Sequence, residues 1–204
     1  MRTTATILEV PEPPTGTGAP QWYWLGGRPA LDFVNTRRER WRRDFDCLLS
    51  DADVVRWLIQ AGLLPAPRNA PEGLLAEARE LREAMNDGVR SIVEGDSMDT
   101  AALTLIDDWL VHAGSRPALL PGPGAPLLGE RPPADSPRRG LGMVALDAAR
   151  MLGRSEERLR VRVCASETCS ARFFDRSPSG RRRWCSMALC GNVAKARRHR
   201  ARAG

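Results

Sequence analysis

The sequence predicts a mainly α-helical fold, with a helical N-terminal domain that contains a short β-hairpin and a small C-terminal module built on cysteines. Three observations predict it. Apolar residues recur at helical spacing in four stretches of the first 155 residues. A stretch dense in proline and glycine, which cannot be regular helix, separates the third and fourth of them. Four of the five cysteines lie within 27 residues close to the C-terminal end.

The first 20 residues are rich in proline, glycine and threonine, and we expect them to form a disordered leader. They contain no apolar core of signal-peptide length. No run of about 18 apolar residues occurs in the chain, so neither a membrane-spanning helix nor a membrane partner is expected. These observations favour a cytoplasmic protein.

Residues 22–36 allow two interpretations. Their pattern indicates a short strand, a Gly–Gly turn and then the first turns of a helix. In one interpretation the aromatic residues line the core, as a hairpin packed on the helices. In the other they form the mouth of a small-molecule pocket in the helical domain, with Arg28 and Asn35 supplying polar contacts. The candidate pocket residues are Trp22, Trp24, Arg28, Asp32 and Asn35.

Helical periodicity predicts longer helices over residues 51–62, 71–94, 97–113 and 141–153. Ser50 or Asp51 is the natural N-cap of the first helix, and Gly62 with Pro65 ends it. Four residues of the third helix are expected to face inward, namely Leu103, Ile106, Leu110 and Val111. Residues 114–140, which are rich in proline and glycine, should form a long loop or a loose hairpin.

The clustered cysteines form two matched pairs. Cys164-x4-Cys169 is followed by fifteen residues and then by Cys185-x4-Cys190. Thiols stay reduced in a protein without a secretion signal, so such clustering favours a metal over disulfides. Zinc prefers four tetrahedral ligands, and four thiolates leave no open position for water. The spacing therefore predicts one structural Zn²⁺ held by Cys164, Cys169, Cys185 and Cys190.

The residues around the two pairs predict the fold of the module. Strands are expected at residues 160–163, 171–175 and 181–184, and a helix over residues 191–203. A pair, a hairpin, a second pair and a helix together form a treble-clef-like zinc finger, and so small a piece needs a metal to fold. The predicted organisation is a leader of residues 1–20, a helical domain of residues 21–155 and a finger of residues 156–204.

Charge is divided unevenly along the chain. Residues 150–204 carry 15 basic and 4 acidic residues, whereas residues 1–149 carry 16 basic and 21 acidic ones. An acidic body with a strongly basic tail indicates a polyanionic partner, most simply nucleic acid. The tail lacks the bulky apolar face that a helix lying on a membrane needs.

The candidate nucleic-acid-binding residues lie on the arm before the second cysteine pair and on the final helix. They are Arg181, Arg182, Arg183, Asn192, Lys195, Arg197, Arg198, Arg200 and Arg202. Like charges at spacings of three and four repel one another on a helix, and a polyanion would relieve that repulsion. Asn192 and Lys195, at the start of the helix, are the candidates for reading bases. The alternative is a solvated or protein-binding surface.

Two runs of the sequence resemble a known family. The finger resembles the CGNR zinc-finger family in the runs Phe173-Phe174-Asp175-Arg176-Ser177 and Arg181-Arg182-Arg183-Trp184-Cys185-Ser186-Met187-Ala188-Leu189-Cys190-Gly191-Asn192. The start of the helical domain is similar to the opening of the ABATE domain, in the runs Leu25-Gly26-Gly27-Arg28 and Leu31-Asp32-Phe33-Val34-Asn35-Thr36. The resemblance implies a bacterial, often actinobacterial, transcription regulator whose finger binds DNA or RNA. The family motif ends in arginine, whereas this chain has Val193, so any contact of that arginine is either lost here or taken over by Lys195 or Arg197.

We predict a DNA-binding transcription regulator, with DNA favoured over RNA as the partner. The helical domain would then be a ligand-sensing or dimerisation module, and a homodimer would help a short finger to reach useful affinity. One alternative is an enzyme, or a repurposed small-molecule-binding protein, with its pocket in the helical domain. Another is an RNA-binding protein. No nucleophile–base pair or metal-ligand set outside the finger favours the enzyme, and the chain has only two histidines.

Overall fold

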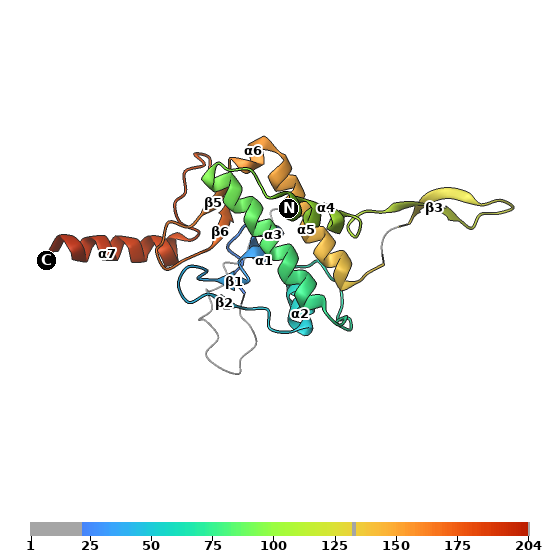
Figure 1. Cartoon of the computed structure of the whole chain (residues 1–204), viewed down its shortest axis with the longest axis horizontal. Coiled ribbons are helices and arrows are strands. Elements are labelled where there is room, and N and C mark those ends of the chain that lie inside the picture. The colour runs from blue at the N-terminus through green and yellow to red at the C-terminus, as the bar shows by residue number, and fades with distance from the viewer. Residues whose placement is uncertain (1–21, 132–133, 204) are drawn as a thin grey trace, which may run out of the picture. The chain divides into compact units, whose positions relative to one another are not determined.

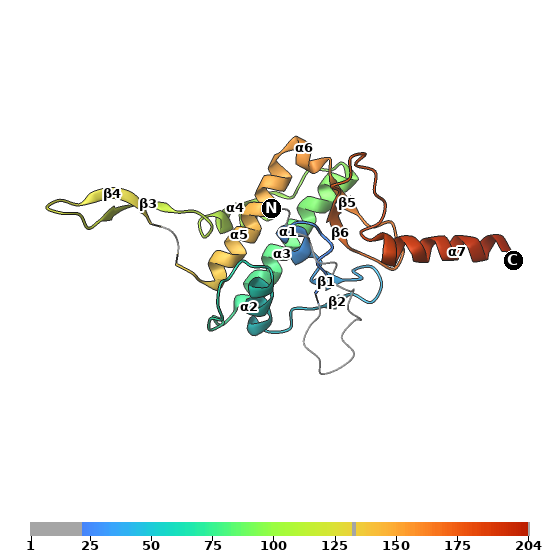
Figure 2. The same ribbon diagram turned by 180° about the vertical axis from the view of Figure 1, so that it is seen from behind.

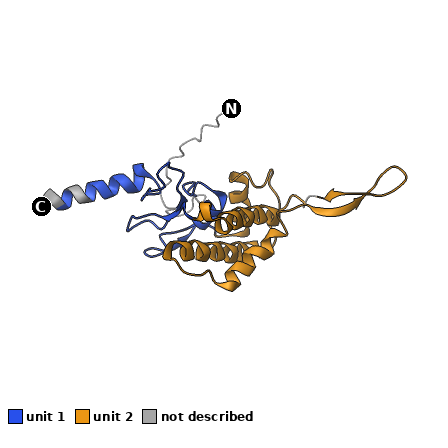
Figure 3. Ribbon diagram, turned by 90° about the horizontal axis from the view of Figure 1, so that it is seen from above, with its two compact units in different colours: residues 1–48, 159–204 blue, residues 49–158 orange. Residues whose placement is uncertain are grey.

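The structure is a computed structural model that describes residues 22–131 and 134–203 (Figure 1). The predicted leader, residues 1–20, lies outside the described residues. The described chain forms two compact units, one of residues 22–48 with 159–203 and one of residues 49–158 (Figure 3). We call the first the finger unit and the second the helical unit. Residues 22–48, which the sequence places in the helical domain, thus group with the cysteine-rich module.

The described residues of the helical unit form the helices α2 (Asp51–Gln60), α3 (Leu74–Glu94), α4 (Thr100–Leu110), α5 (Pro137–Gly153) and α6 (Ser155–Arg158). The four longer helices confirm the predicted periodicity. Helix α2 begins where the Oγ of Ser50 accepts a hydrogen bond from the N–H of Asp53 at 3.2 Å. Helix α5 begins before the predicted start because Ser136 caps it and Pro137 suits the first helical position.

Helices α3 and α5 lie at the centre of the helical unit, because they pack against each other and each packs against α2 and α4. All four helices contribute buried apolar side chains, among them Trp57, Leu58, Leu74, Leu81, Ile106, Trp109, Leu141 and Val144. The predicted inner face of α4 is wrong at two positions, because Leu103 and Val111 are exposed. Leu103 lies at the rim of a cavity, and Val111 follows the last residue of α4.

The residues between α4 and α5 form an antiparallel hairpin that extends away from the helices of this unit (Figures 1 and 2). Strand β3 (Arg116–Leu120) pairs with β4 (Leu127–Arg131), with Leu119 opposite Leu128. The prolines and glycines gather in the connection between the strands, where no ladder hydrogen bonds are needed. The predicted loose hairpin is therefore formed.

The finger unit combines short elements from both ends of the described chain. They are α1 (Pro29–Val34), β1 (Arg37–Arg38), β2 (Phe45–Asp46), β5 (Val161–Val163), β6 (Arg172–Phe174), the π-helical turn η1 (Met187–Gly191) and α7 (Asn192–Ala203). The strand expected at residues 181–184 is not formed. Instead, the N–H of Arg182 donates to the buried carboxylate of Asp175 at 2.8 Å, and the C=O of Arg183 accepts from Ala165 at 2.8 Å.

The N-terminal segment covers the free edge of β6. The N–H of Phe174 donates to the carbonyl of Gly26 at 2.8 Å. The buried side-chain amide of Asn35 then forms both hydrogen bonds that a neighbouring strand would form, donating to the carbonyl of Arg172 at 2.9 Å and accepting from its N–H at 2.8 Å. These contacts explain why residues 22–48 belong to the finger unit.

The turn before α1 depends on its two glycines. The N–H of Gly26 donates to the carboxylate of Asp32 at 2.7 Å, and a Cβ at Gly26 would lie only 2.7 Å from the nitrogen of that residue. Gly27 has a φ of 73°, a left-handed conformation that favours glycine. Pro29 then starts the helix at a position where its missing N–H costs nothing. This local geometry carries Asn35 to the edge of β6.

Replacing Asn35 with Ala should lower the free energy of unfolding by about 1–3 kcal/mol, because it leaves buried backbone groups of Arg172 without partners. Chemical denaturation of the zinc-loaded protein measures the change. The exposed Asn69→Ala is the matched control and should shift stability by less than about 0.5 kcal/mol. Equal stability of the two variants would contradict the bridging role of Asn35.

Candidate metal centre and basic surface

The sulfur atoms of the four predicted ligands gather at one point. The Sγ atoms of Cys164, Cys169, Cys185 and Cys190 all lie within 4.8 Å of one another. The Sγ of Cys185 lies 3.8 Å from that of Cys169 and 3.7 Å from that of Cys190. Four thiolates around a tetrahedral zinc at a Zn–S distance of about 2.3 Å are separated by about 3.8 Å. The cluster therefore fits one zinc ion.

Two tight turns position the ligands. In the first turn, between β5 and β6, the N–H of Cys164 donates to the carbonyl of Ala171 at 2.9 Å and that of Cys169 to the carbonyl of Ser166 at 3.0 Å. In the second turn, the carbonyl of Ser186 accepts from the N–H of Cys190 at 3.1 Å, which places this ligand on η1 just before α7. Each ligand pair is thus fixed by backbone hydrogen bonds.

The four thiols share hydrogen bonds. These bonds, first of all that from Cys169, lower the pKa of Cys164, whereas hydrogen bonds to Cys164 raise the pKa of Cys169 and of Cys185. The N–H of Ala171 points at the Sγ of Cys169 at 3.5 Å. With four thiolates the coordination sphere is complete, so the zinc is structural. The fifth cysteine, Cys47, is buried outside the cluster.

A buried carboxylate organises the arm between the two cysteine pairs, residues 176–183. Asp175 is fully buried and accepts hydrogen bonds from the N–H groups of Ser177 at 3.0 Å and Arg182 at 2.8 Å. Burial alone would raise the pKa of Asp175, but these hydrogen bonds hold the pKa below its usual range. From β5, the guanidinium of Arg162 donates to the carbonyl of Gly180 at 2.9 Å. The arm is therefore held at both ends.

The three arginines predicted on the arm have different surroundings. Arg181, Arg182 and Arg183 are all exposed. The guanidinium of Arg182 also donates to the carbonyl of Cys185 at 2.7 Å and lies 5.1 Å from the centre of the Phe173 ring. Arg182 thereby supports the second cysteine pair, whereas the guanidinium of Arg183 lies over the ring of Trp184.

The basic helix α7 follows the last ligand and extends from the rest of the finger unit (Figures 1 and 2). Its exposed predicted contacts are Asn192, Lys195, Arg197 and Arg200, and Arg198 and Arg202 belong to the same helix. Arg183 of the arm and Arg197 of the helix line one hollow of about 330 Å³, together with Trp184. Val193, which replaces the arginine of the family motif, is half-exposed and lines the same hollow.

Most of the candidate pocket residues in the N-terminal segment are buried or form contacts within the finger unit. Trp22 is buried, Asp32 accepts from Gly26, and the guanidinium of Arg28 lies 5.1 Å from the ring centre of Phe174. A cavity of about 270 Å³ lies in the finger unit, and Asn35 is the one member of the predicted set among its lining residues. The other four predicted residues do not line this cavity.

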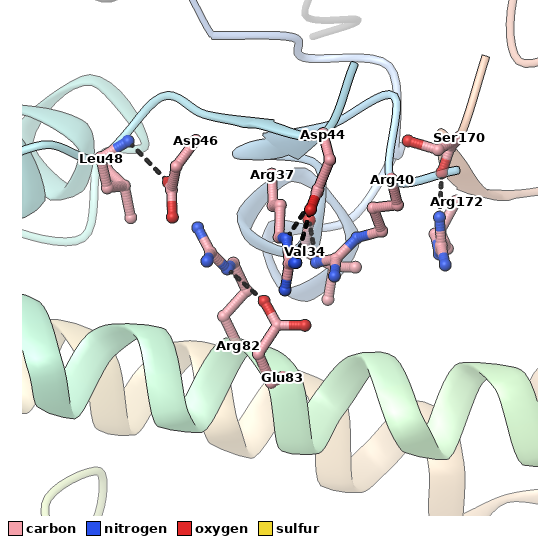
Figure 4. A network of polar contacts seen from close by, with 10 residues as sticks. All are labelled: Val34, Arg37, Arg40, Asp44, Asp46, Leu48, Arg82, Glu83, Ser170 and Arg172. Carbon is pink, nitrogen blue, oxygen red and sulfur yellow. Dashed lines mark hydrogen bonds and ion pairs between the residues drawn. The ribbon is translucent and has the colours of Figure 1, made fainter. Parts of the chain in front are cut away.

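The sequence-based prediction missed the arginines of residues 37–43. Arg38 is buried, and its guanidinium is stacked 3.3 Å from the ring centre of Tyr23 and 5.0 Å from that of Phe45. Burial lowers the pKa of Arg38. Figure 4 shows the surrounding polar contacts, including the pair of hydrogen bonds from Arg37 to Asp44. The sequence signal that could have identified this region is its charge, since residues 37–43 contain five arginines.

The fold and the metal centre define a helical protein that carries a treble-clef-like zinc finger. Residues 27–155 match the ABATE family, described as "Putative stress-induced transcription regulator", and residues 160–203 match the CGNR zinc finger. The chain belongs to the ABATE family and ends in a CGNR zinc finger, as the resemblance implies. No curated protein matches the chain. In the part of the chain that the structure describes, no helix is both long and apolar enough to cross a membrane.

Purified protein should contain one zinc per chain, and Cys185→Ala should abolish zinc retention, because three thiolates cannot complete the tetrahedron. Elemental analysis measures the metal, and circular dichroism should show that the helices of the helical unit remain. Cys47→Ala is the matched control and should keep its zinc, since Cys47 lies outside the cluster. Full zinc retention in Cys185→Ala would contradict this ligand set.

Asp175→Asn should lower the free energy of unfolding by about 1–3 kcal/mol, because an amide cannot accept both N–H groups of the arm. The folded-state pKa of Asp175 is depressed, so its contribution is present above the pKa of an unfolded aspartate and lost only as the pH falls through the lower folded value. The difference should therefore stay constant between about pH 6 and pH 8. The exposed Asp108→Asn serves as the control, and a loss that varied across this range would refute the assignment.

Proposed function

We propose that this protein is a transcription regulator that binds DNA through the finger unit, with zinc as its structural centre. The convergence of two basic elements carries the proposal. Arg183 from the arm and Arg197 from α7 line the same hollow, although they are 14 positions apart in the chain. The arm ends just before the ligand Cys185 and α7 begins just after the ligand Cys190, so both elements adjoin the zinc centre. Basic residues fixed at a defined spacing are suited to successive phosphates.

The charge of α7 supports a polyanionic partner. The helix carries Lys195 and four arginines but no acidic residue. Neighbours at spacings of three and four repel one another, so the free helix is electrostatically strained and a row of phosphates would relieve the strain. Glu167 supplies an acidic contact, because its carboxylate lies 3.5 Å from the guanidinium of Arg197. The description of the ABATE family as a transcription regulator supports DNA over RNA.

The roles of individual residues follow from their places on the finger. Phosphate contacts fall to Arg181, Arg183, Arg197 and Arg200, which are exposed on the arm and the helix. Asn192 and Lys195 are exposed on the first turn of α7 and are the proposed base contacts. Arg182 acts mainly as support for the second cysteine pair.

We also propose that the helical unit senses a small apolar ligand. A cavity of about 350 Å³ lies between α3, α4 and α5, and its size is within the range of small-molecule sites. Its walls are mainly apolar and include Ile92, Met98, Leu103, Ile106, Leu110 and Leu152. The partly exposed position of Leu103 at its rim would allow a ligand to enter. The expected homodimer stays a prediction.

The affinity of the zinc-loaded protein for duplex DNA should depend steeply on salt. If about five arginines each neutralise one phosphate, log K should fall against log salt with a slope of roughly −4 to −5. Arg200→Ala should reduce the magnitude of that slope by about one and weaken all sequences similarly. Fluorescence anisotropy with a labelled duplex, repeated with an RNA hairpin of equal length, measures both effects.

Arg90→Ala is the control for the salt experiment, because Arg90 is an exposed arginine of the helical unit. It should leave the slope unchanged. Binding that did not respond to salt, or that survived removal of the α7 arginines together, would exclude the proposed surface. If the protein bound the RNA hairpin more tightly than the DNA duplex, RNA rather than DNA would be the partner.

A further inference from the structure

The loop between β1 and β2 concentrates basic residues in a second place on the finger unit. Residues 37–44 contain five arginines against Glu39 and Asp44. We call residues 39–44 the Arg–Trp loop, since Trp41 stands at its centre with arginines on both sides. The proposed function of the finger does not use this loop.

The backbone of the Arg–Trp loop is held in an unusual conformation at both ends. Glu39 has a φ of 48° and Asp44 a φ of 47°, in the left-handed region that residues other than glycine rarely adopt. The carbonyl of Glu39 accepts hydrogen bonds from the N–H groups of Arg42 at 2.8 Å and Asp44 at 2.9 Å. Such strain persists where the surroundings enforce it and is concentrated at functional sites.

Side chains close the base of the loop. The guanidinium of Arg37 forms two hydrogen bonds of 2.8 Å with the carboxylate of Asp44, and that of Arg40 reaches back to the carbonyl of Val34 at 3.2 Å (Figure 4). The Nε of Arg43 donates to Glu39 at 2.7 Å, and this contact lowers the pKa of Glu39. The two carboxylates of this segment, those of Glu39 and Asp44, thus both pair with nearby arginines.

The tip of the loop is left facing solvent. The side chains of Arg42 and Arg43 are 57% and 52% exposed, and Trp41 is 50% exposed. Leaving an indole ring in water is unfavourable, and the residues that dominate binding energy at interfaces are enriched in tryptophan and arginine. An exposed aromatic ring between arginines suits a nucleic acid, because the ring can stack on a base while the arginines bind phosphates.

One residue of the first cysteine turn joins the loop to the basic helix. The indole N–H of Trp41 donates to the backbone carbonyl of Glu167 at 3.0 Å, while the side-chain carboxylate of Glu167 pairs with Arg197 at 3.5 Å. Trp41 and Arg197 therefore both contact the same residue, Glu167. The loop is placed beside the surface that we propose for DNA.

We infer that the Arg–Trp loop is a second nucleic-acid contact, in which Arg42 and Arg43 bind phosphates and Trp41 stacks on a base. The inference rests on the proposed function of the finger and extends its contact surface across the first cysteine turn. A purely structural role, in which Trp41 anchors the loop on Glu167 and Arg42 and Arg43 pair with Glu39, accounts for these contacts but not for the half-exposed indole ring beside two half-exposed arginines.

The first test compares Trp41→Ala with Trp41→Phe in the full-length, zinc-loaded protein. Both variants lose the hydrogen bond to Glu167, but only Trp41→Phe keeps an aromatic face. Anisotropy is measured with a labelled duplex that carries a single-stranded overhang. Trp41→Ala should weaken binding by about tenfold, and Trp41→Phe by less than about threefold. Zinc content and melting temperature should match those of the unchanged protein.

The second test replaces both Arg42 and Arg43 with Ala. Loss of two phosphate contacts should reduce the magnitude of the salt slope by about two, with the Arg90→Ala variant as the control. If Arg200→Ala alters binding while the loop variants do not, the loop inference is overturned and the proposed function stands. Equal weakening by Trp41→Phe and Trp41→Ala would also overturn it. Absence of binding by the unchanged protein would overturn both.

Discussion

The zinc–thiolate centre is the interaction on which the finger unit depends. It joins the turn after β5 to the turn before α7, and the apolar cluster around it is small, with Phe173 as its one fully buried large side chain and Leu25 and Trp184 packed against it. Structural zinc contributes about 10–16 kcal/mol to the folding of finger peptides, which far exceeds what burial of so few side chains supplies. The arm ends just before Cys185, and α7 begins just after Cys190. The metal therefore fixes the chain at one end of each basic element, while Asp175 and Arg162 hold the arm.

The zinc centre alone does not complete this unit. One edge of β6 is paired with β5, and the other is paired with a side chain, Asn35, and with the carbonyl of Gly26. A fragment that began at residue 160 would expose those backbone groups, which are costly to leave unpaired. The family models meet between residues 155 and 160, whereas the compact units divide at residues 48 and 158. The boundary between the two family matches and the boundaries of the compact units thus fall at different places in the chain.

Local patterns explain what could be predicted from the sequence. The cysteine spacing reports the metal site directly, because each pair needs only a short turn, and apolar periodicity reports the helices. The contact between Asn35 and Arg172 spans 137 residues and leaves no periodic signal, so a single sequence could equally place Asn35 in a pocket. The charge of residues 37–43 was visible, but its relation to the finger was not, since only the fold brings Trp41 to Glu167. Likewise, Arg182 differs from its neighbours only through its contact with the Cys185 carbonyl.

The pairing of residues 22–48 with residues 159–203 has a consequence for how the protein is made. The helical unit lies between these two segments in the chain, so its helices can pack during synthesis while the N-terminal segment still lacks its partner. Strand β6 and the second cysteine pair follow the helical unit in the chain, so they are synthesised after it. Closure of the finger unit and loading of zinc therefore come after synthesis of the helical unit. A chain interrupted before Cys185 would hold folded helices but no assembled metal site, and it would lack α7.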